Sequence, residues 1–382
     1  MKTLAKMEEI HNILSSNVLD KFEKQMRETK QSPKYHGEGD VYTHTMMVCD
    51  SLKSLPEYKE LPELQQQMLY VAAMLHDIGK ISTTVFKDCD WHAPCHAIKG
   101  SKMARELMFM DYGIGGNSKL IEFRETVCLL IRYHSFPPHA IENEWKQGVL
   151  KMHRIASNSK LLPDFSIKML CILAKADAMG KISDDINEVL ENIEMCAELA
   201  KEEGCYEKCY DFPSDYTMRA YLSGKDVWKS TELYNDTWGS VIVMSGLPGV
   251  GKDTFIQNYF SVLPMVSLDE IRKENKISPT DNQGVVANIA RDQAKEYLRS
   301  HKQFVWNATN LTPQMRDSVV NLIESYNANA DIVYVESSFE RILKQNSQRK
   351  EVVPTNVIES MVKKLIPPMA YESKQVNWIG NG

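Results

Sequence analysis

The sequence has no run of about 18 apolar residues, the minimum for a helix that spans a membrane. The first ten residues, MKTLAKMEEI, are charged throughout and lack the apolar centre of a signal peptide. The eight cysteines are scattered and do not form the framework of a small disulfide-rich domain. We therefore expect a cytoplasmic protein with reduced thiols and no membrane partner.

An excess of positive charge is also absent. The 382 residues include 45 Lys and Arg against 51 Asp and Glu, which gives a formal net charge of −6. An acidic protein has no overall field that would attract nucleic acid or a membrane surface, so any contact with nucleic acid must come from local patches. Internal repeats and low-complexity segments are missing as well, and this length predicts two domains.

The chain changes character near residue 210. The first 200 residues contain apolar positions three and four apart, as in LQQQMLYVAAMLHDIGK, and they predict helix after helix. Beyond them, short β-branched or apolar runs predict strands that alternate with helical stretches, at 240–245, 264–269, 304–309 and 331–337. We therefore expect a multidomain protein, with an all-α domain over residues 1–210 followed by an α/β domain with a parallel sheet over residues 211–382.

A glycine-rich loop joins the first predicted strand to a helix, in the sequence SGLPGVGKDT (245–254). Such a loop presents main-chain N–H groups and a lysine to phosphate oxygens. A purely structural turn would leave the lysine unexplained. The segment therefore predicts an ATP site that contains Gly246, Gly249, Gly251, Lys252, Asp253 and Thr254.

Asp253 occupies the position where phosphate loops usually have a hydroxyl group that binds Mg²⁺. A carboxylate is also a hard oxygen ligand. Thr254 lies about 100° further around the helix and is a poorer substitute. We therefore expect Asp253 to face Mg²⁺.

Two further segments follow predicted strands. VSLDEIR places Asp269 and Arg272 at the carboxyl edge of the sheet, where a carboxylate can accept a hydroxyl proton and an arginine can neutralise charge during phosphoryl transfer. The alternative for Asp269 is a helix cap. NATNLTPQMR places Thr309, Asn310 and Arg316 near the same edge.

The segment FERILKQNSQR follows the last predicted strand and places Arg341 and Arg349 on a helix that could close over ATP. Together, these motifs resemble the 5′-hydroxyl polynucleotide kinases of the P-loop phosphotransferase family over roughly residues 238–370. The resemblance implies that Asp269 is the general base on a 5′-OH and that Arg272 bridges the acceptor and the transferred phosphate. It also implies that Lys252 and Arg349 hold the ATP phosphates. Gln345 departs from the usual lid arginine, and Arg341 is the candidate to compensate for it.

The N-terminal half contains the segment MLHDIGK, in which His76 and Asp77 are adjacent at a helix end and can both reach one metal ion. A single buried histidine is more often an ordinary core residue. The prediction of a metal site therefore depends on the other possible ligands in the sequence. His44 precedes it by about one helix, His96 and His134 follow, and Asp177 lies on a later helix. His92 and His139 are weaker candidates, and we expect His11, His36 and His153 to be surface or cap residues.

This order of residues resembles the HD superfamily of metal-dependent phosphohydrolases over about residues 35–180. The resemblance implies two metal ions that share Asp77, and it places Lys80 close enough to contact a phosphate. Mixed imidazole and carboxylate ligands favour Mn²⁺, Fe²⁺, Co²⁺, Ni²⁺ or Zn²⁺ over Mg²⁺. The implied ligands are His44, His76, Asp77, His96, His134 and Asp177.

The two halves together resemble the bacterial HD-Pnk end-healing enzymes. This resemblance implies that the kinase domain phosphorylates RNA or DNA 5′-OH ends and that the HD domain removes 2′,3′-cyclic or 2′(3′)-phosphates, before a separate RNA ligase joins the strands. The sequence leaves open whether the chain forms a homodimer. Three alternatives stay open: a metabolite or nucleoside kinase fused to a nucleotide phosphohydrolase, a non-catalytic nucleotide sensor, and a nucleic-acid-binding scaffold.

Overall fold

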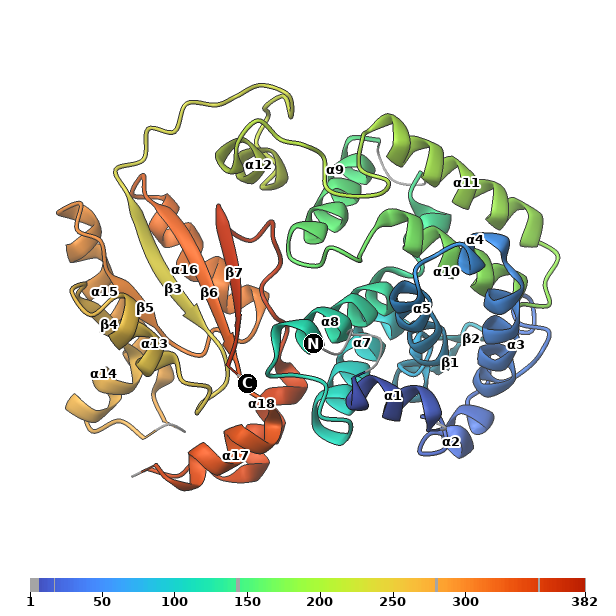
Figure 1. Ribbon diagram of the computed structural model, residues 1–382, viewed down its shortest axis with the longest axis horizontal. Helices are drawn as coiled ribbons and strands as arrows, with labels where there is room; N and C mark the ends of the chain where they lie inside the picture. The colour runs from blue at the N-terminus through green and yellow to red at the C-terminus, as the bar shows by residue number, and fades with distance from the viewer. Residues whose placement is uncertain (1–6, 17, 142–144, 279–280, 350, 382) are drawn as a thin grey trace. The chain divides into compact units, whose positions relative to one another are not determined.

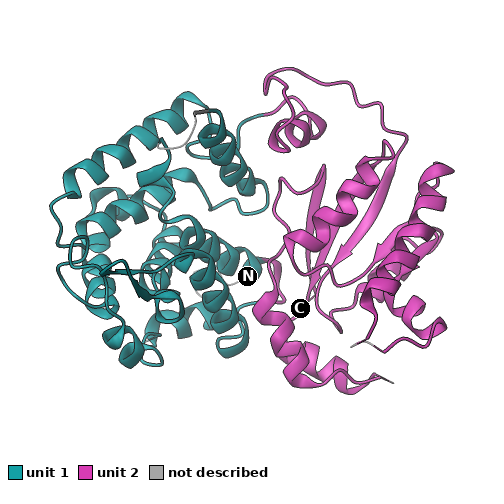
Figure 2. Cartoon of the chain, turned by 180° about the vertical axis from the view of Figure 1, so that it is seen from behind, with its two compact units in different colours: residues 1–115, 119–211 teal, residues 116–118, 212–382 magenta. Residues whose placement is uncertain are grey.

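A computed structural model describes residues 7–16, 18–141, 145–278, 281–349 and 351–381. The chain divides into two compact units (Figure 2). Unit 1 consists of Met1–Gly115 and Lys119–Asp211, and unit 2 consists of Gly116–Ser118 and Phe212–Gly382. Within the described residues, no helix has both the length and the apolar composition needed to cross a bilayer.

Unit 1 is helical, as the sequence predicted (Figure 1). Its core is formed where α3, α5 and α10 pack together through apolar side chains such as Val48, Leu69 and Leu173. The α-helices are α1 (Glu8–Ser15), α2 (Glu23–Glu28), α3 (Val41–Ser54), α4 (Pro56–Lys59), α5 (Glu63–Leu75), α6 (Lys80–Thr83), α7 (His96–Glu106), α8 (Ser118–Tyr133), α9 (Trp145–Ala156), α10 (Ile167–Met179) and α11 (Ile186–Glu202). Shorter helical segments are η2 (Leu107–Asp111), η3 (Pro137–His139) and η4 (Ser157–Lys160).

A small hairpin interrupts the helices of unit 1. Strand β1 (Val85–Lys87) pairs antiparallel with β2 (Asp90–His92). Asp88 and Cys89 form the turn between them, with positive φ values of 51° and 61°. The sequence did not indicate this hairpin, although the domain is helical as predicted. Strands of three residues are too short to give a readable alternation of apolar and polar positions.

Unit 2 contains a parallel sheet whose five described strands lie in the order β4-β5-β3-β6-β7, which confirms the predicted fold class. The strands are β3 (Ser240–Ser245), β4 (Met265–Ser267), β5 (Val305–Asn307), β6 (Asn329–Glu336) and β7 (Gln375–Gly380). The helices are α12 (Asp215–Leu222), α13 (Lys252–Tyr259), α14 (Leu268–Glu274), α15 (Gln283–Arg299), α16 (Pro313–Glu324), α17 (Phe339–Ser347) and α18 (Thr355–Lys364).

The core of unit 2 fixes the edge of the sheet at which chemistry can occur. Buried side chains of α15 and α16, including Ala290 and Val320, pack against Val241, Val243 and Ile332 of β3 and β6. Because the strands are parallel, their carboxyl ends share one edge, and ligands bind at that edge in open α/β sheets. The glycine loop, α14 and α17 all begin there.

Candidate active sites

The glycine loop of unit 2 has a backbone that only glycine adopts readily. Gly249 and Gly251 have φ values of 80° and 95°, in the left-handed region. A Cβ atom on Gly246 would lie 2.3 Å from the carbonyl oxygen of Val335. Nζ of Lys252 donates to the carbonyl oxygens of Gly246 and Leu247, both at 2.9 Å. The lysine thus lies against the glycine loop, with which it is expected to hold the ATP phosphates.

The electrostatic surroundings of Lys252 bring four expected kinase residues together. Burial lowers the pKa of Lys252 to about 8, although Asp253 and Asp269 favour its charged form. Arg349 lowers the pKa of Lys252 further through charge repulsion. Asp253, Asp269 and Arg349 therefore all influence the charge of the lysine.

Asp253 lies exposed in the first turn of α13 and has a partner that the sequence did not indicate. Its Oδ1 accepts a hydrogen bond of 2.8 Å from Nδ2 of Asn307, at the carboxyl end of β5. The only sequence signal for Asn307 was its place within the predicted strand 304–309. Thr254 is exposed on the same helix.

Asp269 and Arg272 form a pair in α14. Nη1 of Arg272 lies 2.5 Å from Oδ1 of Asp269, and Nε of Arg272 donates to Oε1 of Gln283 at 2.9 Å. The side chain of Asp269 is 73% exposed, so an acceptor can reach it. The hydroxyl of Ser267, rather than Asp269, caps the helix. The structure thus gives the cap role to another residue.

The residues that follow β5 brace the loop. The carbonyl oxygen of Thr309 accepts a hydrogen bond from N–H of Gly246, and the side chain of Asn310 donates to the carbonyl oxygen of Met244. Arg316 is fully buried and donates to the carbonyl oxygen of Asn310. The main chain of Thr309 and the side chains of Asn310 and Arg316 therefore support the sheet edge from within, although the sequence placed these residues beside the ligand.

Helix α17 flanks an open cavity of about 440 Å³. The cavity is lined by Ser338, Glu340, Arg341, Lys344, Gln345 and Gln348. The side-chain amide of Gln345 can be oriented so that both its nitrogen and its oxygen form hydrogen bonds. In this orientation, the nitrogen donates to the carbonyl oxygen of Gly249 and the oxygen accepts from Nε of Arg341. Gln345, at the position of the usual lid arginine, thus contacts the glycine loop. Arg349 is exposed just after the helix.

In unit 1, three of the expected histidine ligands are oriented in the same way. Nδ1 of His76, His96 and His134 lies 2.7–2.8 Å from a main-chain carbonyl oxygen three residues earlier. These hydrogen bonds place the proton on Nδ1, so Nε2 of each ring retains a lone pair. A lone pair on Nε2 is what a metal ion requires.

The Nε2 atoms converge on Asp77. Nε2 of His76 lies 3.4 Å from Nε2 of His44, and Nε2 of His96 lies 3.3 Å from Nε2 of His134. Oδ2 of Asp77 faces the first pair at 3.4 and 3.6 Å, and Oδ1 lies 3.4 Å from His96. Asp77 therefore belongs to two triads, in each of which the ligand atoms lie within 4.8 Å of one another.

Asp177 joins the first triad, because its Oδ1 lies 3.1 Å from Nε2 of His44. Oδ1 of Asp77 and Oδ1 of Asp177 are buried and lack a hydrogen-bond partner among the described residues, although Nζ of Lys181 lies 3.4 Å from Oδ1 of Asp177. A buried oxygen without a donor that faces imidazole lone pairs, as Oδ1 of Asp77 does, is costly unless a cation lies between them. The residues therefore fit a pair of divalent transition-metal ions.

Lys80 is buried beside this site. Its Nζ lies 2.6 Å from Oδ2 of Asp77 and donates to Oε1 of Gln31 at 2.7 Å. Burial would raise the pKa of Asp77, but Lys80 and the neighbouring imidazoles hold it well below its usual range. The shared carboxylate is therefore ionised and available as a ligand.

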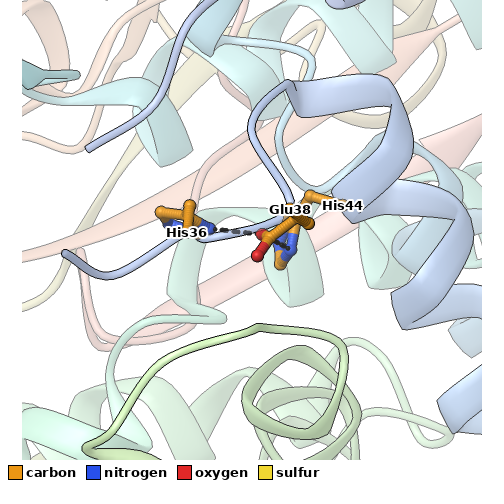
Figure 3. Close-up of side chains that lie close together, drawn as sticks. All are labelled: His36, Glu38 and His44. Carbon is orange, nitrogen blue, oxygen red and sulfur yellow. Dashed lines mark hydrogen bonds and ion pairs between the residues drawn. The ribbon is translucent and has the colours of Figure 1, made fainter. Parts of the chain in front are cut away.

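Glu38 and His36 also belong to the site, although we expected His36 on the surface (Figure 3). Oε1 of Glu38 lies 2.9 Å from Nδ1 of His44 and 2.8 Å from Nδ1 of His36, and Oε2 accepts N–H of Ile182 at 2.9 Å. Nδ1 of His44 also faces the carbonyl oxygen of Gly180 at 3.2 Å. Burial lowers the pKa of His36 to about 4. Glu38 is thus a carboxylate behind an expected metal ligand, an arrangement that orients the imidazole and increases its basicity.

The remaining histidines lie outside the two triads. His153 was expected on the surface but is buried, with Nε2 2.9 Å from Oε2 of Glu203. Its position on α9 faces the core of the unit, which the sequence pattern did not reveal. His11, His92 and His139 are exposed.

Comparisons with known proteins find a match in each of the two units. The HD domain family matches residues 41–178, and an AAA domain family matches residues 241–368. The chain is also similar to L-seryl-tRNA(Sec) kinase of Methanococcus maripaludis, with 23% identity over 135 residues, or 34% of this chain and 53% of the relative. The chain thus spans about half the length of this curated relative.

These matches define the class of protein. The chain joins a helical HD domain, of the kind found in metal-dependent phosphohydrolases, to a P-loop kinase-like domain with a parallel sheet. Nucleotide binding, kinase chemistry and hydrolase chemistry are therefore supported.

Proposed function

We propose that this protein is a bifunctional enzyme that heals broken RNA ends. Unit 2 transfers the γ-phosphate of ATP to a 5′-OH, and unit 1 hydrolyses 2′,3′-cyclic phosphate or 2′(3′)-phosphate ends. The observation that carries the proposal is the presence, in one chain, of two different phosphate-directed sites. One is the pair of triads that share Asp77, and the other is the glycine loop with Asp269 and Arg272 at the same sheet edge.

In the kinase unit, loop N–H groups and Lys252 hold the ATP phosphates. Asp269 takes the proton of the 5′-hydroxyl as that oxygen bonds to the γ-phosphorus and ADP leaves. Arg272 neutralises charge on the transferred group, and its bond to Gln283 fixes its position. Asp253 would hold Mg²⁺, while Arg341 on α17 and Arg349 just after it would contact the ATP phosphates as the helix closes over the nucleotide.

In the phosphoesterase unit, the four histidines with Asp77 and Asp177 would hold two divalent ions such as Mn²⁺, Co²⁺, Ni²⁺ or Zn²⁺. Such ions neutralise phosphate charge and activate water for attack on phosphorus. Lys80 adds positive charge beside the shared carboxylate. Glu38 holds His44 in orientation, and burial of the ligands keeps bulk water from competing with their contacts.

The two reactions fit the two sides of one break. Many ribonucleases leave a 2′,3′-cyclic phosphate and a 5′-OH, whereas ligation generally requires a 3′-OH and a 5′-phosphate. A cytoplasmic enzyme with both activities would prepare both ends for a separate RNA ligase.

End-label transfer tests the proposal. The protein is incubated with ATP and RNA that carries 5′-OH and 2′,3′-cyclic phosphate ends, alongside the Asp269→Ala and Asp77→Ala variants. We expect the first change to abolish 5′ phosphorylation alone and the second to abolish 3′-end dephosphorylation alone. Loss of both activities from either change would refute two independent sites, and absence of both from the parent would refute the proposal.

A second candidate function is a kinase that phosphorylates the hydroxyl group of a nucleoside or of serine carried on tRNA. The similarity to L-seryl-tRNA(Sec) kinase favours this candidate. That relative is, by its name, a kinase for L-seryl-tRNA(Sec). In the same assay, phosphate transfer to a nucleoside or to serine carried on tRNA, with none to a 5′-OH oligonucleotide, would support this candidate.

A further inference from the structure

Positively charged side chains collect beside the half of the metal site that contains His96 and His134. His96 begins α7, and Lys99 and Lys102 follow on the same helix. His134 lies directly after α8, two residues beyond Arg132. The two helices pack closely, because a Cβ atom on Gly100 of α7 would lie 3.5 Å from a methyl carbon of Ile131 of α8.

A cavity of about 230 Å³ lies at the end of α8. It is lined by Arg132, Tyr133, Ser135, Phe136, His139 and Lys151. The guanidinium group of Arg132 lies 5.5 Å from the ring centre of Tyr133, and Nζ of Lys151 lies 5.2 Å from the ring centre of Phe136. The cavity thus offers cations and aromatic rings together, the two kinds of group that bind single-stranded nucleic acid.

These cations are not neutralised by nearby acidic groups. Among the described residues, no carboxylate forms an ion pair with Lys99, Lys102, Arg132 or Lys151. Burial lowers the pKa of Lys102, and repulsion by Arg105, Arg132 and Lys99 lowers it further. Like charges held close together, in a protein of net charge −6, are stabilised by an anionic ligand.

We propose that Lys99, Lys102, Arg132 and Lys151 form a cationic surface that binds the phosphodiester backbone of the strand whose phosphorylated 3′ end enters the metal site. This inference rests on the proposed function and specifies its substrate as a polynucleotide. Backbone phosphates upstream of the 3′ end contact the cations, and a base stacks on Tyr133, which is partly exposed, whereas Phe136 is buried. A mononucleotide reaches the metal site but not this surface.

Binding of fluorescently labelled, 3′-phosphorylated RNA provides the test, with ATP absent and with lengths of one, three and six nucleotides. In the parent, we expect affinity to increase with length. The double variant Arg132→Ala/Lys151→Ala should bind the hexanucleotide about tenfold more weakly. The negative slope of log affinity against log salt should become shallower by about 1.4, because two phosphate contacts are lost. Affinity for the mononucleotide should stay unchanged.

A matched control removes two other cations of unit 1, Lys24 and Lys53, the latter lying 4.6 Å from the ring centre of Tyr70. Lys24→Ala/Lys53→Ala should bind every length as the parent does. If Arg132→Ala/Lys151→Ala does not fold, Lys99→Ala/Lys102→Ala on α7 tests the same surface. Parent-like affinity and salt slope in a folded variant, or parent affinity that is independent of length, would overturn the inference.

The readout separates this inference from the proposed function. Hydrolysis of p-nitrophenyl phosphate, which has no phosphodiester backbone, reports the metal site alone. Its rate should be equal in the parent, Arg132→Ala/Lys151→Ala and Lys24→Ala/Lys53→Ala. If the parent lacks that activity, the phosphohydrolase proposal fails. The length dependence of RNA binding then still tests whether the cationic surface binds the RNA backbone.

Discussion

Nζ of Lys80 lies 2.6 Å from Oδ2 of Asp77, the carboxylate that belongs to both histidine triads. A cation in this position repels metal ions and attracts phosphate. Lys80→Met should therefore raise the KM for a phosphate substrate about tenfold, while the protein keeps its bound metal. Steady-state kinetics and metal analysis of the purified variant check both points. A variant that loses metal would show that Lys80 holds Asp77 in place instead of serving the substrate.

Glu38 is expected to strengthen metal binding through His44. Glu38→Gln should weaken the binding of one Mn²⁺ or Co²⁺ ion by about 10- to 100-fold and leave the second unchanged, because only the triad with His44 loses its outer carboxylate. Calorimetric titration of the metal-free protein measures this. Asp40→Asn is the matched control, since Asp40 lies two residues away and its oxygens accept from Thr43. Parent-like affinity in Glu38→Gln would mean that the carbonyl oxygen of Gly180 suffices to orient His44.

The fold was more predictable than the details of the sites. The sequence predicted β3 at the residues it occupies, because β-branched residues run directly into the glycine loop. It missed Glu38, whose place depends on a hydrogen bond with Ile182, 144 residues away. It also missed Asn307 as the partner of Asp253, because that contact depends on the pairing of β5 beside β3. Motifs mark groups that are close in sequence, whereas such partners meet only through tertiary packing.

Asp253 is expected to serve magnesium rather than the nucleotide itself. Asp253→Ala should raise the Mg²⁺ concentration needed for half-maximal kinase activity about tenfold, whereas Asp253→Ser should restore most of the loss with a smaller hard oxygen ligand. Titration of Mg²⁺ at saturating ATP gives these values. Binding of ATP in EDTA should be equal in all three proteins. Asp253→Ala with parent-like Mg²⁺ dependence would exclude this carboxylate from the metal.

ATP binding should weaken as the pH rises above about 8. Burial lowers the pKa of Lys252 to about 8 in the free protein, and phosphate oxygens raise the pKa in the complex because they favour the ammonium form. Binding above pH 8 must therefore take up a proton, so affinity falls as protons become scarce. Calorimetry in buffers of different ionisation enthalpy measures this uptake. Lys252→Arg, which stays charged, should bind with no such dependence, and proton uptake that persists in this variant would assign the effect to another group.

Arg316 and Glu372 form a buried ion pair. Arg316 also donates to the carbonyl oxygen of Asn310, and the side chain of Asn310 in turn donates to Met244 of β3, just before the glycine loop. Their side chains are almost fully buried, with Nε and Nη2 of Arg316 donating to the two oxygens of Glu372 at 2.6 and 2.8 Å. Arg316→Ala leaves a buried carboxylate unpaired and should destabilise unit 2 by about 3–5 kcal/mol. Removing both charges in Arg316→Met/Glu372→Leu should recover much of this loss, because the unpaired charge is then gone. Urea unfolding, followed through the transition that ATP stabilises, measures the change in unit 2. A double variant as unstable as Arg316→Ala would show that the hydrogen bonds of Arg316 to the carbonyl oxygens of Asn310 and Ile366 dominate instead.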